Sequence, residues 1–197
     1  NVPMPPEAVA PAVAAAARAK QLATGASEKE RMLIDAVVAR YSADPKAERA
    51  ALDAAFAAGV ESAVKRFPSD DTLQVLYAEA LMDLQPWDYW EAAGAKPKGR
   101  APDILASLET VLRRNPRHAG AIHLYIHAVE ASTQPEKALP YARRLGALMP
   151  GAGHVVHMPA HIYYRVGLYK ESLETNRVAM TVDENYFKVS ASDPIYK

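Results

Sequence analysis

A repeated histidine spacing constrains the fold of this 197-residue chain more than any other feature. All six histidines lie in one stretch, in two groups: His118, His123 and His127, then His154, His157 and His161. The last two members of each group are four residues apart, and each member of the first pair precedes its counterpart by 34 residues. A fixed step of about this length is typical of repeats made of two helices. We therefore expect equivalent side chains on equivalent helices of two consecutive repeats.

The rest of the sequence predicts helices joined by short turns, because helix formers dominate and β-branched runs of alternating polarity are absent. Ser27 and Glu30 have the spacing of a capping box, which predicts a helix start there. Pro and Gly punctuate the chain and set the other boundaries. The expected helices cover residues 7–22, 28–41, 46–66, 71–84, 102–114, 119–131, 136–148, 155–166 and 169–181, followed by an irregular tail from Asp183 to Lys197.

Residues 86–100 differ from the rest of the chain. They contain both tryptophans and end in a segment rich in glycine, proline and lysine, so we expect an inserted, ordered loop. Trp87 either covers a binding groove or helps to bury the insert. When Pro116 and Pro150 are taken as repeat ends, the repeat that starts near Asp71 is about 14 residues longer than 34, which matches this insert.

The segments from His118 to Ser132 (HAGAIHLYIHAVEAS) and from Gly151 to Tyr163 (GAGHVVHMPAHIY) resemble a bacterial group of histidine-bearing tetratricopeptide-repeat proteins without a settled biochemical role. The resemblance implies an all-α fold, a right-handed solenoid of antiparallel helix pairs, within a longer protein. The expected divisions are N-terminal helix pairs at 1–68, a repeat with the insert at 69–118, repeats at 119–152 and 153–186, and a tail at 187–197.

The resemblance also implies a concave groove lined by the first helix of each pair. Its register directs seven side chains into that groove: Glu79, His123, His127, Glu130, His154, His157 and His161. A peptide, a protein segment or a small ligand is then the expected partner. Tyr125, Tyr163, Tyr164 and Trp87 are further candidates for the groove.

Histidines four residues apart on one helix can share a metal ion, because their Cβ atoms are about 5–6 Å apart. Pairs on adjacent helices can converge on one ion, since packed helices lie about 8–10 Å apart. Neutral imidazole suits Zn, Cu, Ni or Fe. Glu79 or Glu130 is a candidate fourth ligand, or a second acceptor that fixes an imidazole tautomer.

Pro159 argues against this arrangement. It lies between His157 and His161 and disfavours helical angles at Met158. If a helix starts at Pro159, the four-residue geometry fails and His154 falls in the preceding loop. The alternative is that the histidines bond backbone carbonyls and tyrosines, or bind a peptide carboxylate.

Composition excludes several functions. The formal net charge is +0, so no basic surface predicts nucleic-acid binding. No apolar run is long enough to cross a membrane. Without cysteine, thiolate ligands are excluded and the compartment, cytoplasmic or periplasmic for a soluble chain, cannot be read.

Three functions are consistent with the sequence. The first is a binding module whose six histidines, with His118 among them, hold a divalent transition metal and a ligand. The second is a metal-dependent enzyme in which the ion activates water and Glu79 or Glu130 acts as base. The third is an interaction scaffold in which the histidines are structural.

Overall fold

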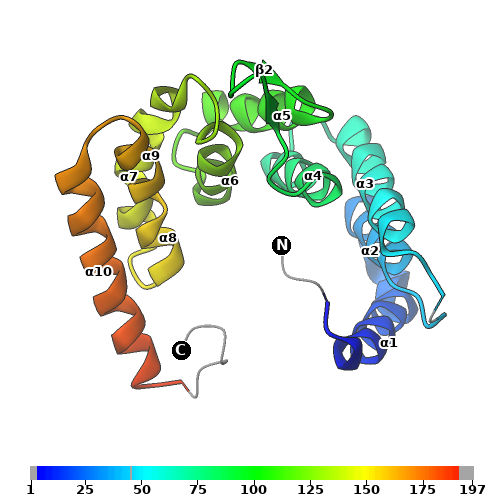
Figure 1. Cartoon of the computed structure of the whole chain (residues 1–197). Coiled ribbons are helices and arrows are strands. Elements are labelled where there is room, and N and C mark those ends of the chain that lie inside the picture. Colours follow the sequence, from blue (N-terminus) through cyan, green and yellow to red (C-terminus); the bar gives the residue numbers. More distant parts are fainter. Residues whose placement is uncertain (1–3, 45, 191–197) are drawn as a thin grey trace. The chain divides into compact units, whose positions relative to one another are not determined.

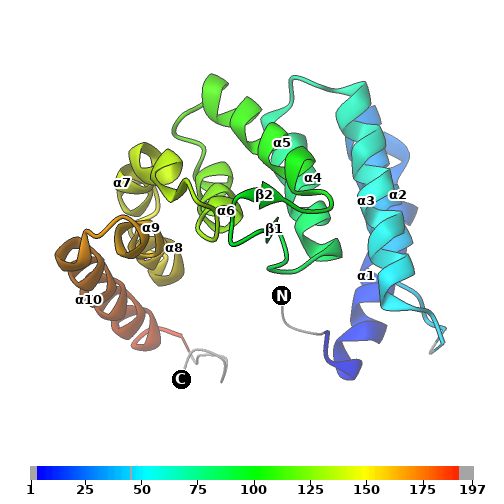
Figure 2. The ribbon, with the colours of Figure 1, turned by 45° about the horizontal axis from the view of Figure 1, so that its top comes forward.

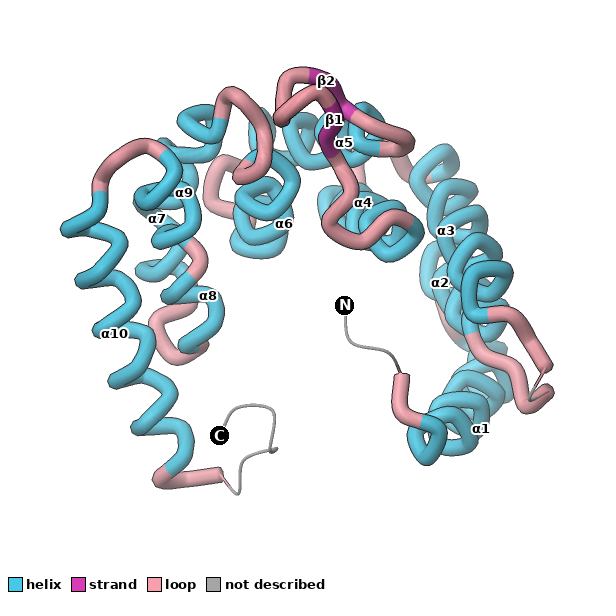
Figure 3. The backbone as a smooth tube through the Cα atoms, viewed as in Figure 1, coloured by secondary structure: helices cyan, strands magenta, loops and turns pink. Residues whose placement is uncertain are grey.

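The computed structural model describes residues 4–44 and 46–190, and almost all of its regular structure is α-helical (Figure 3). The all-α expectation is therefore confirmed. The chain divides into two compact units. Unit 1 comprises Asn1–Tyr89 and Gly99–Ser107, and unit 2 comprises Trp90–Lys98 and Leu108–Lys197. The solenoid and the repeat boundaries stay predictions.

Among the described residues, four helices lie wholly in unit 1 and pack in chain order, each on the next. They are α1 (Pro6–Leu22), α2 (Glu28–Arg40), α3 (Arg49–Arg66) and α4 (Asp71–Leu84), with a short 3-10 turn at Ala23–Gly25 after α1. The predicted capping box before α2 is present, since Ser27 accepts a hydrogen bond from the Glu30 amide and Glu30 accepts one from the Ser27 amide. Figure 2 shows α2 and α3 side by side.

The insert before α5 (Ala101–Arg114) forms a small hairpin of two antiparallel strands, β1 (Trp90–Glu91) and β2 (Lys96–Pro97). Its turn holds three consecutive residues with positive φ, ending at Gly94. A Cβ atom at Gly94 would lie 2.4 Å from the Ala131 carbonyl oxygen, so only glycine fits there. The Trp90 indole donates to the Ala128 carbonyl at 2.7 Å. The hairpin thus fastens the C-terminal end of the first histidine helix.

Unit 2 contains the histidines. Its helices are α6 (Ala119–Val129), α7 (Leu139–Leu148) after a 3-10 turn at Pro135–Ala138, α8 (Gly153–His157), α9 (Pro159–Arg165) and α10 (Tyr169–Phe187). Helix α10 lies alongside α8 and α9 (Figure 1). The core is formed by fully buried aliphatic side chains, among them Ile122, Ile126, Leu145 and Ile162.

Several helix boundaries differ from the expectation by a few residues, and two of the differences have a clear physical reason. The second histidine helix runs from Gly153 to Arg165 with an interruption, because Pro159 has no amide hydrogen to donate. Helix α10 continues to Phe187 instead of ending near Thr181, since no Gly or Pro interrupts the sequence there. The tail expected from Asp183 is therefore wrong as far as Phe187, and residues 191–197 of that tail lie outside the described residues. Within the described chain, no helix combines the length and apolar character needed to span a bilayer.

Candidate metal centre

Five of the six histidines meet in unit 2. Their ring centroids form a closed circuit with successive separations of 5.0, 5.6, 4.8, 6.3 and 5.0 Å. In the order of that circuit they are His123, His127, His161, His157 and His154, returning to His123. We call these five residues the histidine cluster. The expected convergence of imidazoles from two helical segments is present in the structure.

Helix α6 directs its two histidines to one side because residues four apart share a face. The helix is held by Ile122 and Ile126, which are fully buried. His123 and His127 are only partly buried, and their rings meet edge to face. The apolar positions therefore anchor α6 while the histidines stay accessible.

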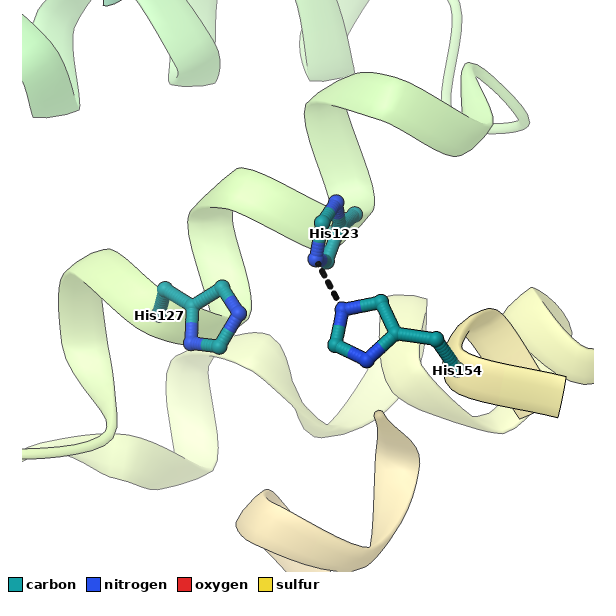
Figure 4. A group of neighbouring side chains, drawn as sticks. All are labelled: His123, His127 and His154. Atoms are coloured by element: carbon teal, nitrogen blue, oxygen red, sulfur yellow. Dashed lines mark hydrogen bonds between the residues drawn. The ribbon is translucent and has the colours of Figure 1, made fainter. Parts of the chain in front are cut away.

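One part of the cluster has the geometry of a three-ligand site. The Nε2 atoms of His123 and His154 are 3.1 Å apart. One nitrogen from each of His123, His127 and His154 can be chosen so that all three lie within 4.8 Å of one another. Figure 4 shows His154 reaching from α8 toward the two rings on α6. His154 lies on a helix, not in the preceding loop.

The other part of the cluster is the pair His157 and His161, which lie on either side of Pro159. Met158 joins α8 to α9 with φ −51° and ψ −38°, which are helical angles. The chain therefore continues as a helix through the proline, despite the disfavoured angles before it. As a result, the Nε2 atoms of His157 and His161 are only 2.9 Å apart.

Glu130 links the two parts of the cluster. Its Oε1 lies 3.1 Å from His127 Nδ1, and its Oε2 lies 2.6 Å from His161 Nδ1. Burial alone would raise the pKa of the Glu130 carboxyl, but hydrogen bonds and positive charge from the two histidines outweigh it and lower the pKa to about 2. Glu130 is therefore an anion placed to orient two imidazoles, which corresponds to one of the three roles expected for it.

Sequence reasoning missed Asn176. Its Oδ1 lies 2.7 Å from His157 Nδ1, while its Nδ2 donates to the Ser172 carbonyl at 2.9 Å. Asn176 lies on α10, outside both histidine segments. No spacing in the sequence indicates this contact, because it depends on how α10 packs on α8 and α9.

Burial keeps part of the cluster uncharged. It lowers the pKa of His123 to about 4, and charge from His127, His154 and His161 adds to this effect. Partial screening from water and the neighbouring imidazoles also lower the pKa of His154, which is otherwise exposed, against a smaller opposing effect of Asp183. Both rings are thus neutral near pH 7, the form that binds a metal.

Several predicted residues lie elsewhere. His118 precedes α6, and its Nδ1 accepts a hydrogen bond from the Ala121 amide at 3.2 Å, so it caps the helix. Tyr125 is buried, and its hydroxyl donates to Glu109 at 3.0 Å. Tyr163 lines a different pocket, of about 330 Å³. Tyr164 is exposed and borders the His157–His161 pair.

Glu79 and Trp87 belong to unit 1. Glu79 is exposed, but partial screening from water and the neighbouring Asp83 raise its pKa against the opposing effect of Arg40. Trp87 is 61% exposed and has a φ of 63°. Their roles as groove residues stay predictions.

The comparisons with known proteins found no relatives: no family model matches the chain, and neither curated proteins nor solved structures give a significant match. The function therefore has to be argued from the geometry of the cluster.

Proposed function

We propose that this chain is a binding module of the tetratricopeptide-repeat type that holds a divalent transition-metal ion with His123, His127 and His154. The observation that carries the proposal is the approach of three imidazole nitrogens to within 4.8 Å of one another. Nitrogen ligands of one zinc ion at about 2.0–2.1 Å lie about 3.3 Å apart at the tetrahedral angle. The 3.1 Å between His123 Nε2 and His154 Nε2 is close to that separation.

The surroundings of the ligands support this proposal. Metal-binding histidines commonly donate their second N–H to a carboxylate, which fixes the tautomer and makes the ligand nitrogen more basic. Glu130 offers this contact to His127 at 3.1 Å. The lowered pKa values of His123 and His154 remove the competition from protons at neutral pH.

Three imidazoles leave one position of a tetrahedral ion open. Donor chemistry restricts the ion to Zn, Cu, Ni or Fe, which neutral imidazole suits. His154 is exposed, so the open position is within reach of solvent. A peptide, a protein segment or a small ligand that supplies the fourth donor is the partner that we propose for the groove of a helix-pair solenoid.

Metal analysis of tag-free protein tests the proposal. The protein is dialysed against zinc and then against metal-free buffer, and bound zinc is measured by mass spectrometry. We expect the wild type to retain zinc. The variant His123→Asn/His154→Asn should bind zinc with an affinity lower by more than about 100-fold, because losing only a residue that hydrogen-bonds to a ligand already costs about 10–100-fold.

His118→Asn is the matched control. It removes a histidine of the same sequence group but keeps a good helix cap, so zinc retention should not change. If folded wild type retains no zinc, nickel, copper or iron, the histidines form a structural network of hydrogen bonds and the proposal is wrong.

A further inference from the structure

The hydrogen positions of the His157 and His161 rings can be assigned from their neighbours. The assignment indicates a role for this pair beside that of the first site. The Asn176 amide donates through Nδ2 to the Ser172 carbonyl, so its oxygen faces His157 Nδ1 at 2.7 Å. An amide oxygen can only accept. His157 Nδ1 therefore carries a hydrogen atom and donates it to Asn176.

The same argument applies to the other ring. His161 Nδ1 lies 2.6 Å from Oε2 of Glu130. An ionised carboxylate only accepts, so His161 Nδ1 is also a donor. A neutral imidazole that carries its hydrogen at Nδ1 has a lone pair at Nε2. In the neutral form of both rings, the lone pair is consequently on the nitrogen that faces the other ring.

Two lone pairs thus face each other at 2.9 Å, the separation of the two Nε2 atoms. This contact is repulsive unless a cation lies against both nitrogens. Two ligands at about 2.0–2.1 Å from one ion are about 2.9 Å apart when they subtend about 90°. The pair has the separation of two adjacent ligands of one metal ion.

The pair is also separate from the first site. The three nitrogens that lie within 4.8 Å of one another come from His123, His127 and His154, and neither ring of the pair belongs to that group. Glu130 places one carboxylate oxygen on a ring of each set, on His127 and on His161. One partly buried negative charge thereby supports two neighbouring groups of imidazoles.

A pocket of about 220 Å³ gives the pair access to solvent. It is lined by both histidines, Glu130, Asn176, Tyr164 and Arg165. Arg165 is fixed by a hydrogen bond to the Ser132 carbonyl at 3.0 Å. An ion held by only two imidazoles has open coordination positions, and water or a small anion can reach them from this pocket.

We infer that the histidine cluster is a two-ion centre, in which His157 and His161 hold a second divalent transition-metal ion beside the ion of His123, His127 and His154. This inference rests on the proposed function for the first ion. Two-metal sites in proteins place their ions about 3.5–4 Å apart. Such a centre can bind a small anion across both ions.

The number of ions per chain tests the inference. Equilibrium dialysis of tag-free protein with Zn(II) should give two ions for wild type and for His118→Asn, and one for His157→Asn/His161→Asn. The remaining ion of that variant should keep its affinity within about threefold. Asn176→Leu, which removes the acceptor that orients His157, should weaken only the second ion, by about 10–100-fold.

Every other number of bound ions contradicts either the proposed function or the two-ion centre. No bound ion means that the proposed function itself is wrong. One ion in wild type, with unchanged affinity in the double variant, overturns the inference and leaves the first site intact; a shared proton then lies between the two rings. One ion that the double variant loses also overturns it, because both sets of ligands then serve a single metal.

A measurement on wild type alone covers the case in which the variants fail to fold. Two Cu(II) ions about 3.5–4 Å apart couple magnetically. We expect the electron paramagnetic resonance spectrum of fully loaded protein to show a coupled pair. The spectrum of isolated Cu(II) at full loading contradicts the two-ion centre.

Discussion

Both units contain partly buried carboxylates, but different side chains donate hydrogen bonds to them. In unit 1, Arg40 lies 3.2 Å from Asp53 and 2.6 Å from Asp83, and Arg49 also contacts Asp53. In unit 2, Glu130 is bonded by His127 and His161. In both units the negative charge of a partly buried carboxylate is stabilised by hydrogen bonds, from guanidinium in unit 1 and from imidazole in unit 2.

The difference lies in whether the donating side chain keeps a lone pair that can bind a metal ion. Guanidinium is always protonated and has no lone pair, so the arrangement around Arg40 can only be structural. Imidazole that donates through Nδ1 keeps a lone pair at Nε2. Histidine therefore satisfies Glu130 and still presents ligand atoms, which is why we assign ion binding to unit 2 alone.

The largest expected effect separates the two units directly. Zinc at about 1,000 times its Kd should stabilise the structure that binds it by about 4 kcal/mol. Hydrogen-exchange mass spectrometry should show slower exchange in peptides of α6 with zinc, reversed by chelator, and no change in peptides of α3. Equal protection of α3 and α6 would contradict the assignment of the ion to unit 2.

The next effect concerns Glu130. Glu130→Gln keeps the size of the side chain but removes the charge that orients His127 and His161, so zinc affinity should fall by about 10–100-fold. Isothermal titration calorimetry measures the change. Glu136→Gln, an exposed position of the same unit, is the control and should leave the affinity unaltered. An unchanged affinity for Glu130→Gln would remove Glu130 from the site.

Arg40→Met tests the other half of the comparison. It leaves Asp83 and Asp53 with less compensation, at side-chain exposures of only 19% and 15%. We expect a loss of about 2 kcal/mol in the free energy of unfolding by urea, below the cost of breaking a fully buried pair. Zinc affinity should stay the same. Arg177→Met, which breaks an exposed pair with Glu174, should cost about 0.5 kcal/mol or less.

The smallest effect is a pH dependence of the metal-free protein. The pKa of His123 is about 4 when folded and 6.5 ordinarily, so between these values the unfolded chain binds a proton that the folded chain does not. Stability should fall as pH drops below 6.5, by less than about 1.4 kcal/mol per pH unit from His123, and His154, whose pKa is also lowered, should add to the slope with the same sign.

Urea unfolding between pH 7.5 and 5.5 measures this slope. Staying a full pH unit above 4.5 keeps the contribution of Glu130 small, because its pKa is about 2 when folded and 4.5 ordinarily. His123→Asn should flatten the curve. A wild-type curve that is already flat would mean that His123 is not shielded from water.

Much of the fold was predictable because it depends on local signals. The capping box of Ser27 and Glu30 and the turn before Asp71 set helix starts that the structure confirms. The 34-residue step predicted that histidines of two helical segments would meet, and the ring contact of His127 with His161 agrees with it. That the chain is a tetratricopeptide-repeat solenoid stays a prediction.

The details of the candidate site were less predictable because they depend on tertiary packing. Asn176 reaches His157 only through the packing of α10, and His118 serves its own helix as a cap. The sequence named Glu130 as a candidate but did not indicate that one carboxylate would serve two rings. Pro159 indicated a helix start, yet the surrounding core keeps Met158 helical and fully buried.

The junction at Pro159 has a mechanical consequence. Proline has no N–H to donate to the carbonyl of Val155. The continuous helical segment of α8 and α9 therefore lacks one backbone hydrogen bond at Pro159, between His157 and His161. Flexing at this point strains one backbone hydrogen bond fewer than the same movement elsewhere in the two helices, and the His161 amide still donates to the Met158 carbonyl at 3.2 Å. The gap between the two imidazoles can therefore change at a lower cost here, which would let the proposed second site accept ions of different radius.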